Sequence, residues 1–142
     1  NLTAEKAAAQ GAEAVSKETL FREADFISVN LKLSERSRGL VGAADLALMK
    51  PDAWIVNTAR GPIIDGAALL AALKAGRIGG AALDVFDVEP LPADDDLRRL
   101  DNVVATPHVG YVTRENYATM YRVTAENILA FLAGKPQNVI EA

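Results

Sequence analysis

The chain has 142 residues, half of them hydrophobic, with a formal net charge of −4 and no cysteine. This length suffices for one domain with a hydrophobic core. The acidic balance and the lack of a basic tract argue against nucleic-acid binding. No apolar run approaches the roughly 20 residues that cross a membrane. The absence of cysteine excludes disulfides and agrees with a reducing compartment, so we expect a cytoplasmic location. With a single histidine as well, we expect no metal site.

The first part of the chain is predicted to alternate helices and strands. In chain order the expected elements are a helix at 4–10, a weak strand at 12–15, a helix at 16–24, a strong strand at 26–31, a polar loop at 32–38 and a short helix at 43–49. The short helix is stopped by Pro51, because proline disfavours helical backbone before it and cannot continue a helix.

The next stretch holds the strongest pattern in the sequence. Residues 53–56 form a short uncharged run with β-branched and aromatic side chains, which is typical of a strand buried on both faces of a parallel sheet. Arg60 follows that strand, and Asp65 then precedes an alanine- and leucine-rich helix as a candidate N-cap. Gly76 is expected to end this helix.

The remaining elements continue the alternation. They are a strand at 81–85, a long loop at 86–101, a strand at 103–105, a helix at 113–133 and an extended tail. Strands that alternate with helical crossovers predict an α/β fold with a parallel, doubly wound sheet. The acidic run Asp94-Asp95-Asp96 is interpreted as a solvated loop.

Polar side chains follow each strong strand. These are Asn30 and Lys32, then Asn57, Thr58 and Arg60, then Asp84 and Glu89, and finally His108. Since the carboxyl ends of parallel strands meet at one edge of a sheet, where ligands bind in α/β folds, we expect these residues to converge there.

Among these residues, His108 is the candidate for proton transfer near neutral pH. A carboxylate on its other ring nitrogen would fix its tautomer, and Glu89 is the candidate for that role. Arg60 offers a planar fork that holds a carboxylate through two hydrogen bonds. Each of these three residues also has a structural interpretation when it is considered alone. His108 is then a structural histidine, Glu89 an exposed loop glutamate and Arg60 a surface arginine.

Three longer motifs carry a family resemblance. They span residues 56–65, 80–90 and 106–110, and read VNTARGPIID, GAALDVFDVEP and TPHVG. Together they closely resemble the NAD-dependent D-isomer-specific 2-hydroxyacid dehydrogenases, in order and with the expected spacing, over nearly the whole chain. The resemblance implies a Rossmann-like fold and the reversible reduction of a 2-keto acid to a D-2-hydroxy acid with NAD or NADP.

The resemblance also implies roles for particular residues. Arg60 would bind the substrate carboxylate and keto oxygen, His108 would exchange a proton with that oxygen, and Glu89 would pair with the histidine. Asp84 would lie by the nicotinamide carboxamide. The expected cofactor-binding set is Asn30, Leu31, Lys32, Thr58, Ala59, Arg60, Asp84, His108 and Gly110. A homodimer is usual in the family.

Parts of the family pattern are different or absent. Asn30 and Lys32 stand where many members carry histidine and proline. Glu89 argues against the formate dehydrogenase branch, which usually has glutamine there. The Gly-x-Gly-x-x-Gly turn is not found. We therefore expect residues 1–110 to be the later part of the cofactor domain, and residues 111–142 to be a helix and tail that return toward a missing substrate domain. Such a fragment is expected to be inactive alone.

Two other readings remain open at this point. A nucleotide-sensing corepressor of the kind this family contains can keep Arg60, Glu89 and His108. A flavodoxin-like module would instead require a phosphate-binding loop, and no such loop is found in the sequence.

Overall fold

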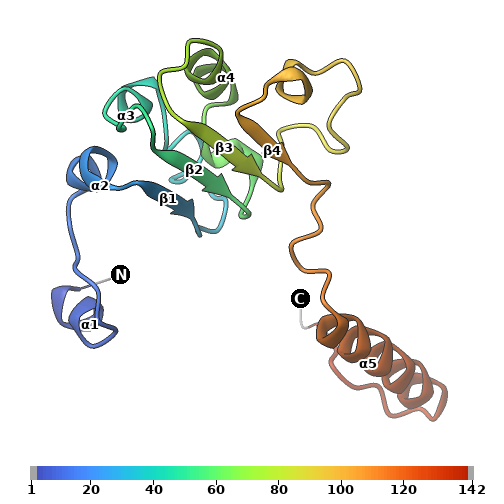
Figure 1. Cartoon of the computed structure of the whole chain (residues 1–142). Helices are drawn as coiled ribbons and strands as arrows, with labels where there is room; N and C mark the ends of the chain where they lie inside the picture. Colours follow the sequence, from blue (N-terminus) through green and yellow to red (C-terminus); the bar gives the residue numbers. More distant parts are fainter. Residues whose placement is uncertain (1–2, 141–142) are drawn as a thin grey trace. The chain divides into compact units, whose positions relative to one another are not determined.

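The computed structural model describes residues 3–140, so the outermost residues of the two predicted domains, 1–2 and 141–142, lie outside the described part. Four parallel strands form one sheet in the order β1-β2-β3-β4, and Figure 1 shows them side by side. The strands are β1 Phe26–Val29, β2 Trp54–Asn57, β3 Gly80–Leu83 and β4 Val103–Ala105. The fold is a Rossmann-like α/β fold, as the alternating pattern predicted.

The register of the sheet separates a core face from a more open face. Ile27 pairs with Ile55, which pairs with Ala81, and all three side chains are buried. On the opposite face, Phe26 is 73% exposed and Val104 is 56% exposed. Because side chains alternate between faces along a strand, the apolar side chains of one set of strand positions form the core.

The helices end close to their predicted positions. They are α1 Ala4–Ala8, α2 Lys17–Glu23, α3 Ala43–Leu46, α4 Gly66–Lys74 and α5 Arg114–Leu132, with 3-10 turns η1 Gly61–Ile63 and η2 Asp96–Arg99. Leucines of α3 and α4 and Phe21 of α2 join the same hydrophobic cluster as the buried strand residues. These three helices therefore cover the core face of the sheet.

Two expectations were wrong in detail. Residues 12–15 form no strand, because all four are exposed and no neighbouring strand pairs with them. The acidic run is more than a solvated loop. The Asp95 side chain accepts a hydrogen bond from the Leu97 N–H at 2.9 Å and caps η2, and Asp96 forms an ion pair with Lys74 at 2.5 Å.

The predicted cap of α4 gives a direct test of how the sequence specifies this helix. The Asp65 side chain accepts a hydrogen bond from the Ala68 N–H at 3.0 Å. We expect Asp65→Ala to lower the free energy of unfolding by about 1 kcal/mol, because a helix donor loses its partner. Asp65→Asn should lose at most a few tenths of that, since asparagine caps as well as aspartate. Urea unfolding of the three chains measures the difference, and equal losses in both variants would contradict the capping role.

The chain divides into two compact units, one ending at His108 and one beginning at Val109. The second unit is built on α5, whose N-cap Thr113 accepts a hydrogen bond from the Asn116 N–H at 3.2 Å. The rings of Tyr117 and Tyr121 contact each other on this helix in a tilted arrangement, with centroids 5.7 Å apart. Large apolar side chains of the helix are exposed in this unit, among them Tyr121 at 70% and Leu132 at 75%. None of the helices within residues 3–140 has the length and apolar character to cross a membrane.

Candidate active site

Arg60 lies on a short turn between β2 and η1. Asn57, the last residue of β2, is only 1% exposed and spans this turn with its side-chain amide. The Asn57 Oδ1 accepts a hydrogen bond from the Ala59 N–H at 3.0 Å, and its Nδ2 donates to the Arg60 carbonyl at 3.0 Å. Beyond the arginine, Ile63 is fully buried and anchors η1 in the core. The backbone on both sides of Arg60 is therefore fixed.

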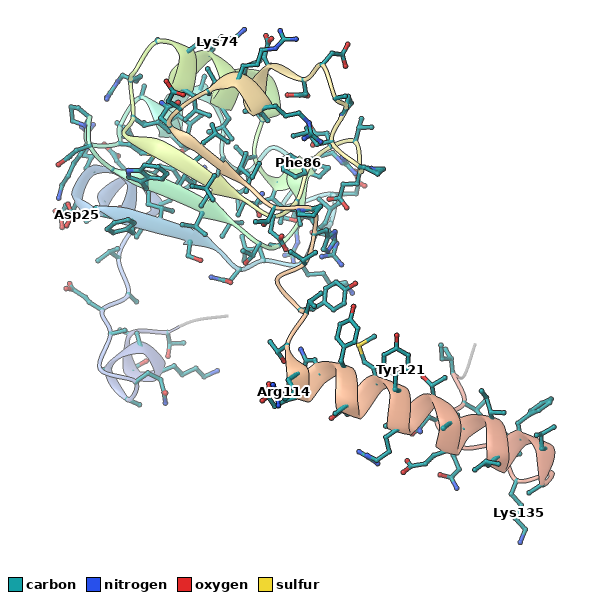
Figure 2. All side chains as sticks on the ribbon, turned by 45° about the vertical axis from the view of Figure 1, so that its right-hand side comes forward. Asp25, Lys74, Phe86, Arg114, Tyr121 and Lys135 are labelled. Atoms are coloured by element: carbon teal, nitrogen blue, oxygen red, sulfur yellow. The ribbon has the colours of Figure 1, made fainter. Side chains whose placement is uncertain are left out.

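Gly61 brings this turn against the loop that follows β3. A Cβ at position 61 would lie 2.2 Å from the Phe86 carbonyl carbon and 2.7 Å from the Asp87 nitrogen, so no larger residue fits without moving backbone. Figure 2 labels Phe86 at this edge of the sheet. The close approach places the Arg60 turn beside the segment that carries Glu89.

The Arg60 guanidinium is exposed and close to the protein surface. Its Nη1 donates to the Ala59 carbonyl at 2.6 Å, and among residues 3–140 no carboxylate forms an ion pair with it. Its positive charge nevertheless contributes to lowering the pKa of Glu89. Thr58 is exposed and Ala59 is partly buried on the same turn. The arginine is thus a cation on a rigid turn, available for an anion.

Glu89 and His108 form the contact that the sequence predicted. The Glu89 Oε2 lies 2.7 Å from the His108 Nδ1, and the Glu89 Oε1 accepts a hydrogen bond from the Phe86 N–H at 2.9 Å. The hydrogen bond with His108, followed by that from Phe86, holds the pKa of Glu89 below its ordinary value. An ionised carboxylate only accepts hydrogen bonds, so the Nδ1 of His108 carries the hydrogen and Nε2 is the ring atom directed elsewhere.

The backbone of His108 has an unusual conformation. Its φ is +57°, in the left-handed region that costs a non-glycine residue about 1–2 kcal/mol. Such a conformation persists only where the surroundings impose it, and it is concentrated at functional sites. The imidazole borders a pocket of about 300 Å³. The pocket is lined by Phe86, Glu89, Pro90, Leu91, Pro107 and His108.

Asp84 directly follows β3 and carries a buried carboxylate, 6% exposed. Its Oδ1 accepts a hydrogen bond from the Thr106 Oγ1 at 2.5 Å, while the Thr106 N–H donates to the Leu83 carbonyl at 2.9 Å. The hydroxyl therefore orients this carboxylate from the neighbouring strand end. A carboxylate fixed in this way is an acceptor for an amide N–H of a ligand.

The other predicted cofactor residues are more dispersed. Asn30, Leu31 and Lys32 follow β1, the edge strand farthest from β4 in the sheet order. The Asn30 Nδ2 donates to the Ser28 Oγ at 2.9 Å, Leu31 is 48% exposed, and the Lys32 carbonyl accepts from the Ser37 Oγ at 2.8 Å. Gly110 belongs to the second unit. The structure brings Glu89 and His108 into contact, and the Arg60 turn packs against the loop that carries Glu89.

Two residues that shape the site are assigned no role from the sequence alone. Asn57 appears there only as a polar residue at the end of a strand, and Thr106 only as part of a motif. A polar residue that interrupts an apolar strand pattern is the signal that points to Asn57, because a buried amide needs hydrogen-bond partners. No such signal exists for the contact between Thr106 and Asp84, which follow different strands.

The pairing of Glu89 predicts how stability depends on pH. A carboxylate whose folded pKa lies below its unfolded value of about 4.5 stabilises the fold above that pH, and this contribution is lost as the pH falls through the folded pKa. We expect Glu89→Gln to unfold more readily than the wild type near pH 7, and the difference to shrink as the pH falls below 4.5 and through the folded pKa of Glu89. Urea unfolding across this range measures the effect. A difference of the same size at both ends of the range would exclude the ionised pair as its cause.

A Rossmann-like parallel sheet, with polar and charged side chains at the carboxyl ends of its strands, defines a nucleotide-binding α/β domain. Within that class, the family model for the D-isomer specific 2-hydroxyacid dehydrogenase NAD binding domain matches residues 1–110. The chain belongs to this family.

Individual relatives agree with the family assignment. Glyoxylate/hydroxypyruvate reductase B of Enterobacter agglomerans is 48% identical over 83% of this chain and 36% of its own length. Glyoxylate reductase of Aeropyrum pernix is 47% identical over 92% of this chain and 39% of its own. The crystal structure of a phosphoglycerate oxidoreductase from Vibrio cholerae superposes with a TM-score of 0.84 at 36% identity, covering 92% of this chain and 42% of that one. The chain thus spans well under half the length of these relatives.

Proposed function

We propose that this chain is the catalytic part of the cofactor domain of a D-2-hydroxyacid dehydrogenase, which transfers a hydride between NAD(P)H and a 2-keto acid. The observation that carries the proposal is the Glu89–His108 hydrogen bond of 2.7 Å at the sheet edge where the Arg60 turn is fixed. The names of the relatives support small substrates of the glyoxylate and hydroxypyruvate type.

The residues of the site fit a nicotinamide cofactor. The Asp84 carboxylate is buried and held by Thr106, which suits it to accept a hydrogen bond from a carboxamide. Thr58 and Ala59 offer the turn after β2 as a surface for the cofactor. When bound, the nicotinamide supplies the hydride chemistry. Within residues 3–140 no group of side chains is arranged to hold a metal ion, and the proposal needs none.

Each residue of the proposed trio has a separate task in the reduction. Arg60 binds the substrate carboxylate and places the keto carbon. His108 donates the proton on Nε2 to the keto oxygen as negative charge grows there, and it takes that proton back in the oxidation. Glu89 holds the Nδ1 hydrogen of His108 and so fixes the orientation of the ring for the transfer. The product is the 2-hydroxy acid.

The test uses the whole protein that contains this chain. Oxidation of NADH and of NADPH is followed with glyoxylate, hydroxypyruvate, pyruvate and a bulkier 2-keto acid. Turnover with one or more of these acids is expected, and the better cofactor and acid define the specificity. Tight cofactor binding without any turnover would overturn the proposal in favour of a nucleotide-sensing regulator.

Three further properties remain predictions. They are a homodimer, a cytoplasmic location and the domain boundary after residue 110.

A further inference from the structure

We propose that Asn57 is a positioning residue that sets the substrate-binding geometry of Arg60. The inference rests on the proposed function, because it concerns how Arg60 meets a carboxylate. It goes beyond that function by assigning the task to a buried side chain that contacts neither substrate nor cofactor in the proposed site. The role is derived from four features of the turn.

The first feature is the strand position of Asn57. In the sheet register, Asn57 lies between Val29 of β1 and Leu83 of β3, which are 5% and 4% exposed. Both neighbours show that this row of the core face accommodates aliphatic side chains. Placing an amide in such a row is unfavourable unless its polar atoms are satisfied. An asparagine here is therefore explained by its hydrogen bonds and not by packing.

The second feature is where those hydrogen bonds go. Both polar atoms of the side chain bind the turn that carries the arginine, one at the Ala59 N–H and the other at the Arg60 carbonyl. The Arg60 carbonyl also accepts the Ile63 N–H at 3.3 Å. Asn57 thus joins the start of the turn to its end, so it fixes the direction in which the Arg60 side chain leaves the backbone.

The third feature is the space beside the turn. Asn57 and Gly61 border a pocket of about 260 Å³ that extends toward Phe86 and α4. On the pocket side the turn has fewer packing neighbours, so the hydrogen bonds of Asn57 add to the contact that Gly61 makes with the Phe86 backbone.

The fourth feature is the coupling of this turn to the other half of the site. Gly61 lies against the Phe86 backbone, and the Phe86 N–H holds the Glu89 carboxylate at 2.9 Å. A turn that shifts at Arg60 changes the position of the guanidinium relative to the Glu89–His108 pair. A misplacement of about 1 Å costs on the order of a hundredfold in rate, so a smaller shift of Arg60 is enough for a tenfold effect.

The experiment compares Asn57→Ala with wild type in the whole protein. We expect the KM for the 2-keto acid to rise about tenfold, with smaller changes in kcat and in the dissociation constant for NADH measured by fluorescence, because Ala59 of the cofactor surface lies on the same turn. Asn102→Ala is the matched control. Its side-chain Nδ2 also donates to a backbone carbonyl, that of Leu73 at 3.2 Å, but away from the Arg60 turn. We expect its KM to be that of the wild type.

A double-mutant cycle separates positioning from a general structural role. If Asn57 acts through Arg60, adding Asn57→Ala to Arg60→Ala raises the KM by less than about twofold. A tenfold rise in both backgrounds would overturn the inference. If Asn57→Ala does not fold, Asn57→Leu replaces it, because the flanking row is aliphatic; a wild-type KM in the folded leucine variant would also overturn it.

The outcomes distinguish this inference from the proposed function. If the wild-type protein reduces no 2-keto acid, the function fails. If the wild type turns over and Arg60→Ala raises the KM while Asn57→Ala does not, the function stands and the positioning role of Asn57 fails.

Discussion

Replacing His108 by glutamine lowers kcat for 2-keto acid reduction by about 10²–10⁴-fold, which is the expected loss when a general acid is removed. Glutamine retains hydrogen-bonding atoms but has no proton to exchange near neutral pH. The KM for the acid should change little, since the arginine is intact. Steady-state kinetics of the whole protein, with the thermal midpoint of the variant, measure the effect.

The backbone of His108 requires a second variant as control. With φ at +57°, residue 108 is strained for glutamine, and a folding defect would lower activity without any role in proton transfer. Asparagine tolerates the left-handed region better and also lacks the proton. We expect His108→Asn to be the more stable variant and to lose as much kcat. Near wild-type turnover in the asparagine variant would contradict the role of His108 as proton donor.

Replacing Arg60 by alanine raises the KM for the 2-keto acid by about ten- to a hundredfold. This magnitude follows from losing a charge-assisted pair of hydrogen bonds worth roughly 1.5–3 kcal/mol. Arg60→Lys should recover only part of the loss, because lysine keeps the charge but not the planar fork. Initial rates over a range of acid concentrations, at saturating cofactor, give both parameters.

A matched removal of positive charge is available on α2. Arg22 is exposed and pairs with Glu18 one turn away, at 3.0 Å. Arg22→Ala removes one positive charge, as Arg60→Ala does, and we expect it to leave the KM unchanged. An equal rise in KM in both variants would show that long-range charge, and not the Arg60 contact, controls substrate binding.

Local sequence patterns predicted most of the framework. Apolar runs marked the strands, and Asp65, the predicted N-cap, caps its helix with its side chain. Thr3, Ser16 and Thr113 occupy the same position before their own helices and also accept a backbone hydrogen bond there. These features are readable because they depend on neighbours within a few residues. The weak strand at 12–15 was wrong, since a strand forms only where another strand pairs with it.

The candidate site was partly readable for a different reason. In a parallel sheet every strand ends at the same edge, so residues that follow strands converge even when they are far apart in sequence. Glu89 and His108 follow neighbouring strands and do lie together, 2.7 Å apart. Chain direction does not specify distances or strand order, so the residues after β1 were expected beside those after β3 and β4.

The sequence by itself determined the parallel α/β class, the caps and the set of polar residues at strand ends, because each follows from short-range periodicity and chain direction. Only the tertiary structure decided the contacts between loops: Gly61 against Phe86, Thr106 on Asp84, and the left-handed backbone of His108. These depend on how closely separate segments approach once the core has packed. The hydrogen bonds from the Asn57 side chain to Ala59 and Arg60 were also decided by the tertiary structure, because the amide meets these partners only when the turn is folded.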